Sequence, residues 1–162
     1  MFKSIFIVIF LFSALYSNQN ILNENQTFFL PQQNNEAKDK IIELISNSKE
    51  SIKISMYNFS YKKFAKELVN ASKKGVKVEL ILDKKKVEED NDIYKYLKNN
   101  GIKIIIPKKK LHTKIALIDN TTLIIGSLNW TKESFEENYE ILLILNDKKI
   151  INETNIFFNS FD

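Results

Sequence analysis

Hydrophobic and polar positions along the chain follow two different periods, which predict alternating strands and helices. Alternating apolar and polar residues indicate strands, whereas apolar residues three or four positions apart indicate amphipathic helices. The first part of the pattern predicts a short edge strand ended by a proline, followed by helix, strand, helix, strand, helix and strand. These segments cover residues 27–30, 35–49, 51–57, 61–74, 76–82, 87–99 and 102–106.

Small polar residues and glycines mark the ends of the predicted helices. Asn34 or Asn35 is available as the N-cap of the first helix, and Ser60 is the expected N-cap of the second. Gly75 and Gly101 follow the second and third helices, where glycine commonly ends a helix. Strands that alternate with helices at this spacing imply right-handed crossovers and a largely parallel sheet.

The pattern changes after Pro107. Two short apolar strands, 115–118 and 123–125, flank a turn-like polar sequence. A further strand covers 139–145, and the tail from Asp147 predicts a final helix. We therefore expect an α/β fold with one mixed, largely parallel β-sheet sandwiched between helices, and no internal repeat is visible in the sequence.

The first segment differs from the rest of the chain. Lys3 precedes an apolar run, 5–15, and small or polar residues follow it, as in a secretory signal peptide. The run is short for a membrane-spanning helix, which needs about 20 apolar residues. We expect 1–17 to be a signal peptide or an N-terminal membrane anchor, 18–26 a polar linker and 27–162 the catalytic domain. That domain would lie outside the cytoplasm, as a periplasmic, membrane-anchored or secreted protein.

Composition limits the kinds of chemistry that the chain can perform. The formal net charge is +4, and all 24 basic residues are lysines. Without arginine, any phosphate contact must use the lysine ammonium as a point charge rather than a bidentate fork. Without cysteine, neither a disulfide nor a thiolate metal site is possible. Positive charge favours polyanions such as nucleic acid or anionic lipid headgroups, although abundant Lys, Asn and Ile are also typical of AT-rich coding sequence.

One ordered set of polar residues in the last third of the chain indicates phosphodiester chemistry. The set is His112-x-Lys114-x-x-x-x-Asp119, then Gly126-Ser127-x-Asn129-Trp130, then Asn138-x-Glu140. On a strand, His112 and Lys114 point to the same face. An imidazole nitrogen can attack phosphorus while the ammonium offsets charge on the non-bridging oxygens.

The other members of the set suit the same site. Ser127 and Asn129 can donate hydrogen bonds to the phosphate oxygens, and Glu140 can accept the second ring N–H of His112 and fix its tautomer. Asp119 follows an apolar strand at a turn, where Asp is common for structural reasons alone. We interpret Trp130 as core packing at the edge of the site.

Two lysine runs leave an alternative open. Runs such as 84–86 and 108–110 are more often solvated loops than binding patches, but the second leads directly into His112 and is a candidate lining for a polyanion groove. No His, Asp and Glu cluster has metal-ligand spacing, so we expect neither a metal nor another cofactor.

This ordered set resembles the signature, the HKD motif, of the phospholipase D superfamily. The resemblance extends to 51–59, 65–68, 74–83 and 97–104 and covers roughly 27–146. It is similar to the single-motif bacterial endonucleases of the Nuc and NucT type. The resemblance implies a phospholipase D-like fold, a reaction without metal, and the following site residues. Catalytic residues would be His112, Lys114, Asp119 (as a support) and Glu140, and phosphate contacts would come from Lys114, Ser127 and Asn129.

The resemblance also implies a reaction in two steps that needs two histidines. One imidazole attacks phosphorus to give a phosphohistidine, and the other protonates the leaving alkoxide and then activates water. This chain has a single histidine, His112, and no repeat to supply another. The second must therefore come from a second chain, most simply across a two-fold axis. We expect a symmetric homodimer with one composite site.

Three functions fit these observations. The favoured one is an endonuclease that cleaves DNA, or alternatively RNA, with little sequence preference, because its contacts would be mainly to phosphates. The second is a phospholipase D of the cardiolipin-hydrolysing type, which uses the same chemistry; the lack of an extra apolar loop near the site favours the nuclease. The third is a non-catalytic DNA-binding protein for uptake, which would not need the complete set of site residues.

Overall fold

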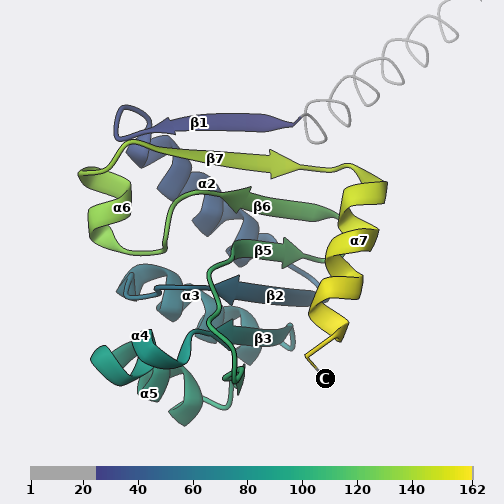
Figure 1. The fold of residues 1–162 in the computed structure, drawn as a ribbon. Coiled ribbons are helices and arrows are strands. Elements are labelled where there is room, and N and C mark those ends of the chain that lie inside the picture. Colours follow the sequence, from purple (N-terminus) through teal and green to yellow (C-terminus); the bar gives the residue numbers. More distant parts are fainter. Residues whose placement is uncertain (1–24, 162) are drawn as a thin grey trace, which may run out of the picture.

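A single seven-stranded sheet organises the computed structural model, which describes residues 25–161 (Figure 1). The strand order is β1-β7-β6-β5-β2-β3-β4. The strands are β1 Gln26–Leu30, β2 Ser51–Met56, β3 Lys77–Leu82, β4 Lys103–Ile105, β5 Lys114–Ile118, β6 Thr122–Gly126 and β7 Glu140–Leu145. The edge strand predicted before Pro31 is β1, which pairs with β7 alone.

Helices cover both faces of this sheet. The larger hydrophobic cluster joins the sheet to α2, α3 and α5, and the smaller one joins it to α7. In Figure 1, α7 crosses one face near one end of the strands, and α2 and α3 lie on the other face. The helices are α2 Asn34–Asn47, α3 Lys62–Lys73, α4 Lys84–Glu89, α5 Asp92–Asn99, α6 Lys132–Glu136 and α7 Lys148–Asn159.

The predicted mixed sheet between helices is confirmed, but the expectation that it is largely parallel is wrong. β2 pairs with β3 and β3 with β4 in parallel, whereas the other four pairings are antiparallel. Helical crossovers build the parallel part and end at β4. The chain then returns to the middle of the sheet, places β5 antiparallel to β2, and continues through β6 to β7.

Both faces of the central strands are buried, which explains their nearly continuous apolar sequences. On β5, Ala116 and Ile118 belong to the larger cluster, and Leu117 between them belongs to the smaller one. Alternate residues of a strand point to opposite faces, so the same strand contributes to two cores. Ile151 and Phe158 of α7 pack against the smaller cluster.

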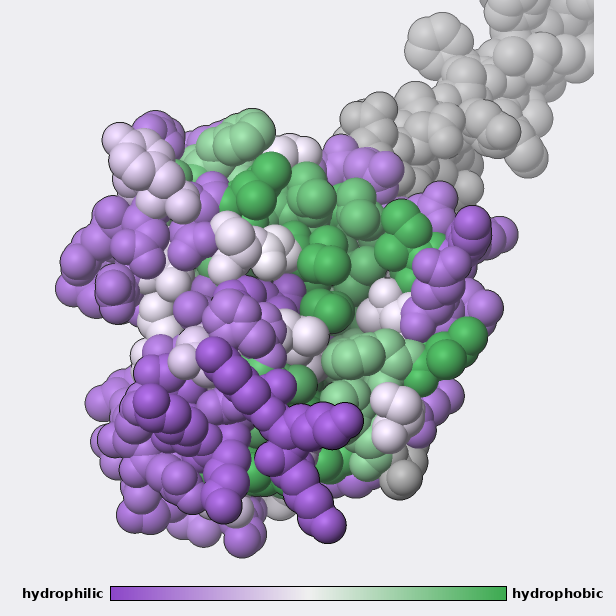
Figure 2. Space-filling view, in the orientation of Figure 1, coloured by the Kyte–Doolittle hydropathy of each residue, from purple (hydrophilic) through white to green (hydrophobic). Residues whose placement is uncertain are grey.

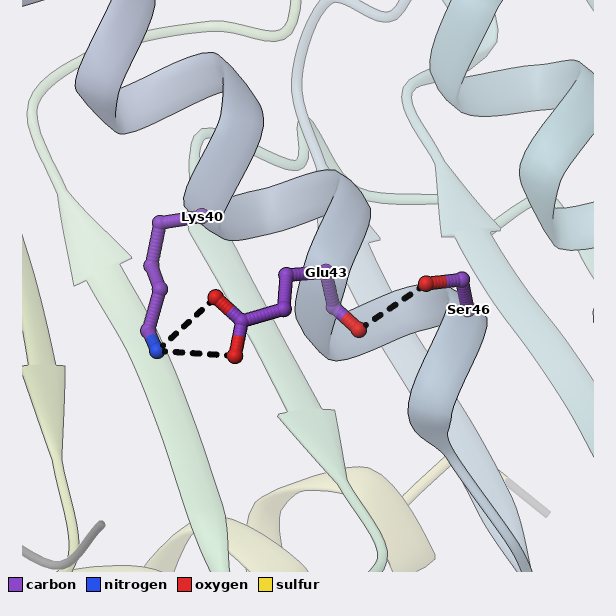
Figure 3. Close-up of polar contacts among 3 residues, drawn as sticks. All are labelled: Lys40, Glu43 and Ser46. Atoms are coloured by element: carbon purple, nitrogen blue, oxygen red, sulfur yellow. Dashed lines mark hydrogen bonds and ion pairs between the residues drawn. The ribbon is translucent and has the colours of Figure 1, made fainter.

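The outer side of α2 is polar and held by local contacts. Lys40 Nζ donates to the two carboxylate oxygens of Glu43 at 3.3 and 3.2 Å, and Ser46 Oγ donates to the Glu43 backbone oxygen at 3.1 Å (Figure 3). Side chains three residues apart meet on a helix surface, and such a pair stabilises it by roughly 0.2–0.5 kcal/mol. The N-cap of α2 is Gln33, so neither Asn34 nor Asn35 caps this helix.

The predicted helix 87–99 is two helices. Asp90 is extended, with φ −144° and ψ 108°, and separates α4 from α5. The expected cap Ser60 is also wrong, because Tyr61 is the N-cap of α3 and makes no side-chain cap bond. Gly75 and Gly101 follow α3 and α5 with φ of +96° and +79°, as expected of helix-ending glycines.

The predicted signal peptide or anchor, 1–17, and nearly all of the linker, 18–26, lie outside the described residues. Gln26, assigned to the linker, is instead the first residue of β1. Within residues 25–161, none of the helices combines the length and the apolar character needed to cross a bilayer.

Candidate active site

Four of the expected site residues gather at one edge of the sheet, namely His112, Lys114, Ser127 and Glu140. β5 and β7 begin at this edge and β6 ends there, because antiparallel neighbours run in opposite directions. His112 and Lys114 lie at the start of β5, Ser127 follows the end of β6, and Glu140 begins β7. β2 and β3 end at the same edge, with Tyr57 and Asp83 directly after them.

His112 and Lys114 both contact the ring of Tyr57. The exposed imidazole of His112 packs edge-on against Tyr57, with ring centroids 4.6 Å apart and an interplanar angle of 60°. Lys114 Nζ lies 5.2 Å from the Tyr57 centroid and donates a hydrogen bond to the His112 backbone oxygen at 3.0 Å. The backbone N–H of Tyr57 donates to the Thr113 oxygen at 2.9 Å. The histidine and the lysine are therefore side by side, as the spacing predicted.

Neighbouring lysines favour the neutral form of the His112 imidazole. The positive charge of Lys114 lowers the pKa of His112 most, followed by desolvation and the charge of Lys110, and the Asp83 carboxylate opposes them. Desolvation likewise lowers the pKa of Lys114, the Glu140 carboxylate opposes this shift, and Lys110 adds to it. A neutral imidazole has a free lone pair, which is the form required of a nucleophile.

A close approach of β6 and β7 fixes Ser127. A Cβ on Gly126 would lie 2.1 Å from the backbone oxygen of Ile141, so only glycine fits there. The Ser127 N–H donates to the same oxygen at 3.0 Å, and Ser127 Oγ accepts from the Ile141 N–H at 3.1 Å. The Ser127 hydroxyl also donates to Glu140 Oε2. These contacts hold the serine hydroxyl and the glutamate carboxylate together beside Lys114.

The expected contact of Glu140 with an imidazole is not made within one chain. Its carboxylate accepts from Ser127 on the adjacent strand, and among the described residues no hydrogen bond joins it to His112. The reason is the strand order: β6 lies between β7, which carries Glu140, and β5, which His112 precedes.

The segment after Ser127 is anchored in the core by Trp130. This side chain is 1% exposed and packs edge-on against Phe59 and Phe64, at centroid distances of 5.4 and 5.0 Å. The prediction that Trp130 packs in the core at the edge of the site is confirmed. Asn129 Oδ1 is buried and has no hydrogen-bond partner among the described residues. Buried polar atoms are normally paired, so this oxygen is an acceptor that the fold of one chain leaves unsatisfied.

Asp119 is not brought to the site. It follows the opposite end of β5, about 16 Å along the strand from Lys114 at the usual rise per residue. Its carboxylate accepts backbone N–H groups from Glu50, Ser51 and Lys49 at 2.8, 3.0 and 2.9 Å. Asp119 therefore anchors the start of β2, and any contribution to catalysis is through the fold rather than by contact.

Two site residues were not singled out from the sequence. Tyr57 carries three ammonium groups around its ring, because Lys86 and Lys110 lie 5.5 and 5.6 Å from its centroid in addition to Lys114. Asp83 is 3% exposed and immediately follows the buried strand β3. An acidic residue directly after a buried strand was the available signal for Asp83. No local pattern distinguishes Tyr57.

A lysine-lined cavity opens beside Tyr57. Its volume is about 450 Å³, and both lysine runs of the sequence contribute to it. In Figure 2, hydrophilic residues gather over the part of this face where α4 and the segment before β5 lie. The lining residues are Tyr57, Asp83, Lys84, Lys85, Glu88, Lys108, Lys109 and Lys110.

Within residues 25–161, no group of three or more His, Asp or Glu side chains is arranged to hold a metal ion.

The fold and the site define a class of protein, and comparison with known families agrees. The chain belongs to the phospholipase D superfamily: the family model described as "Cardiolipin synthase, PLD-like domain" matches residues 41–161. Its fold is that of this phosphodiesterase superfamily. The chain is similar to the structure of NucT from Helicobacter pylori, with a TM-score of 0.77 and 26% identity over 85% of this chain and 94% of that one. It is equally similar to Nuc from Salmonella typhimurium, described as a phospholipase D family member, with a TM-score of 0.78 and 26% identity over 85% and 93% of the two chains.

Curated relatives bear a different name. The "Mitochondrial cardiolipin hydrolase" of Xenopus laevis is 26% identical over 117 residues, which is 71% of this chain and 56% of the relative. The protein of the same name from Canis lupus familiaris is 36% identical over 52 residues, which is 32% of this chain and 19% of the relative. The chain thus spans about half, or less, of the curated relatives that it matches.

Proposed function

We propose that this chain is a metal-independent endonuclease that cleaves DNA, with RNA as the alternative substrate. The observation that carries the proposal is the contact of the His112 imidazole with Tyr57, because the same ring contacts Lys114 and lines a cavity together with both lysine runs. This arrangement suits a phosphodiester within a longer polyanion. The extent of the structural similarity supports the same substrate, because the chain spans 93–94% of Nuc and NucT but 56% of the Xenopus laevis cardiolipin hydrolase.

In the proposed reaction, the neutral imidazole of His112 attacks phosphorus. An N–P bond forms, the P–O bond to the leaving oxygen breaks, and a second imidazole gives its proton to that oxygen. Water then attacks phosphorus, the N–P bond breaks, and the water proton passes to the second imidazole. Lys114 offsets charge on the non-bridging oxygens throughout. The proposed neutral donors to the phosphate are the side-chain N–H groups of Asn129 and the Ser127 hydroxyl, once that hydroxyl has turned away from Glu140.

The second imidazole is proposed to be His112 of another copy, in a symmetric homodimer. The sequence offers no other histidine. An apolar sheet surface beside the site supports a second copy as its occupant: Phe29 on β1 is 58% exposed, and Ile141 and Leu143 on β7 are only half-buried. In Figure 2, hydrophobic residues gather on this face of the sheet. Glu140 directly precedes Ile141 on β7, so burial of such a surface would also bring the Glu140 carboxylate towards the partner.

Mixed dimers test the composite site. Wild-type chains are exchanged with increasing amounts of His112→Ala chains, and activity per wild-type chain is measured. At a three-fold excess, random pairing leaves about a quarter of the wild-type chains in fully wild-type dimers, so activity per wild-type chain falls about four-fold. The matched control is the same excess of Lys73→Ala chains, altered on the exposed end of α3. Unchanged activity per wild-type chain at all ratios would exclude a shared site.

The second candidate is a phospholipase that hydrolyses cardiolipin-type lipids, which the name of the curated relatives favours. The purified full chain is assayed in EDTA with plasmid DNA, single-stranded DNA, RNA and cardiolipin vesicles, with His112→Ala as the inactive control. We expect cleavage of nucleic acid. Lipid turnover without nucleic-acid cleavage would establish the phospholipase instead, and tight DNA binding with no cleavage of any substrate would establish a non-catalytic binding protein.

We also propose that the enzyme acts outside the cytoplasm, either released or tethered by residues 1–17. The support is the signal-like sequence of that segment. Fractionation of cells that produce the full chain, beside cells that produce it without residues 1–17, tests this location. Equal cytoplasmic retention of both forms would refute it.

A further inference from the structure

We propose that the lysine-lined cavity beside Tyr57 is a second phosphate-binding site, which takes a phosphate adjacent to the scissile one in a nucleic-acid strand, and that Asp83 assembles it. The inference rests on the proposed nuclease function and deepens it. It assigns the flanking part of the substrate to particular lysines and gives the buried carboxylate a role.

Asp83 holds the two lysine runs next to each other. Its Oδ1 accepts from the N–H of Lys86 at 3.2 Å, and its Oδ2 accepts from the N–H of Leu111 at 2.9 Å. Lys86 ends the run 84–86, and Leu111 directly follows the run 108–110. The carboxylate is 3% exposed, so water competes little for these contacts. One buried side chain therefore joins two segments that are distant in sequence into a single lysine surface.

The positive charge of this cavity is poorly compensated. Lys84 and Lys85 face Glu88 and Glu89 at 3.8 and 3.7 Å, in exposed pairs that contribute little. Among the described residues, the three lysines of the run 108–110 make no ion pair. The oxygens of Asp83 are directed at backbone N–H groups. Holding these ammonium groups close together raises their electrostatic free energy, and an anion bound among them would lower it.

The cavity begins one side chain away from His112. The Tyr57 ring contacts His112 at 4.6 Å between centroids, has Lys110 Nζ 5.6 Å from its own centroid, and lines the cavity. A strand whose scissile phosphate lies at His112 can thus place a neighbouring phosphate among the lysines. A contact between an ammonium group and a phosphate carries no sequence information, so this site would add affinity without sequence preference.

The test compares two substrates of the full-length enzyme. A labelled single-stranded oligonucleotide reaches both sites, whereas bis(p-nitrophenyl) phosphate has one phosphate and reaches only the catalytic one. For the double variant Lys108→Ala/Lys109→Ala, we expect the ratio of kcat/KM for the oligonucleotide to kcat/KM for the small diester to fall about ten-fold. The slope of log KM against log salt should decrease by about one unit per lysine removed.

The matched control removes the same charge elsewhere. Lys73 and Lys74 are exposed at the end of α3, before β3 begins, and so lie at the opposite edge of the sheet from Tyr57. The double variant Lys73→Ala/Lys74→Ala should keep the wild-type ratio and salt slope. An equal ratio in wild type and the Lys108→Ala/Lys109→Ala variant would overturn the inference, and so would an equal fall in the control.

Asp83→Asn tests the assembly of the site. An amide has one acceptor oxygen, so it keeps at most one of the two backbone contacts. We expect Asp83→Asn to lower the ratio of kcat/KM for the oligonucleotide to kcat/KM for the small diester, as the Lys108→Ala/Lys109→Ala variant does. Asp83→Glu should keep part of the wild-type ratio. A wild-type ratio in folded Asp83→Asn enzyme would refute the role of Asp83. If that variant does not fold, the lysine variants decide the phosphate site.

Wild type that hydrolyses the small diester or cardiolipin vesicles but no oligonucleotide would refute the nuclease function itself. Wild type that cleaves the oligonucleotide, with an unchanged ratio in the lysine variant, would refute only the second phosphate site.

Discussion

Replacement of Gly126 by alanine should destabilise the protein and disable the site together. The added Cβ would lie 2.1 Å from the Ile141 backbone oxygen, so β6 and β7 must separate by about 1 Å or more to reach an ordinary contact. Such overpacking costs about 1–3 kcal/mol. The movement also strains the 3.0 and 3.1 Å hydrogen bonds that join Ser127 to Ile141, each with a net contribution of about 1 kcal/mol. We expect a total loss of about 3 kcal/mol in unfolding free energy.

Thermal unfolding and activity per folded molecule measure the two effects separately. A loss of about 3 kcal/mol lowers Tm by roughly 10 °C in a domain of this size. Activity should fall further than the unfolded fraction explains, because the Ser127 hydroxyl and Glu140 move with the strands. The control is Gly75→Ala, where φ is +96° but nothing lies within 4 Å of the new Cβ. It should cost about 1 kcal/mol and leave activity per folded molecule unchanged. Wild-type Tm and activity in Gly126→Ala would refute the close approach.

Three further substitutions probe charge, anchoring and packing. Lys110→Gln should move the acidic limb of the kcat/KM profile to higher pH. The Lys110 ammonium lowers the pKa of His112, so its removal raises that pKa, and the neutral imidazole forms only at higher pH. An unmoved limb would contradict the charge effect, and Lys73→Gln is the control. Asp119→Asn should lower the unfolding free energy, measured in urea, by about 1–2 kcal/mol, because one carboxylate oxygen that accepts backbone N–H groups is lost. A large loss of activity in the fully folded variant would instead show that Asp119 takes part in catalysis. Trp130→Ala should cost about 3–5 kcal/mol, since a ring 1% exposed is removed from contact with two phenylalanines; a loss under 1 kcal/mol by the same method would show that the ring is not part of the core.

Local sequence patterns predicted most elements of the fold because each depends on neighbouring residues. The segments on either side of Gly75 are examples: an apolar helical stripe before it and a buried strand after it. The pairing of β5 with β2 is a long-range choice, made by packing on both faces, and its antiparallel direction has no local signal. The split near Asp90 was missed because Val87 and Tyr94, seven residues apart, fall on one side of a continuous helix. The wholly polar residues between 88 and 92 were the available signal, and Asp90, Asn91 and Asp92 are typical of a helix start.

The site was predictable where chemistry and spacing coincide, and not where it depends on distant segments. His112 and Lys114 are neighbours in sequence and in space, and Ser127 follows a glycine that the strand contact requires. Tyr57 becomes a site residue only when lysines from α4, the segment before β5 and β5 itself surround its ring. The part of Asp83 in the site depends likewise on Leu111, which reaches it only in the folded chain.

The location of Asp119 gives the motif spacing a physical meaning. The five residues of β5, Lys114–Ile118, bring the chain from the catalytic edge to the point where Asp119 binds the start of β2. The interval between Lys114 and Asp119 is therefore set by the length of β5, which separates the two edges of the sheet. An inserted or deleted residue within this interval would exchange the two faces of the strand, each of which is buried in a different hydrophobic cluster, and would move either Lys114 or Asp119 out of place. The spacing of the motif thus reflects the length of a strand in the fold, and only the residues at the start of that strand belong to the candidate site.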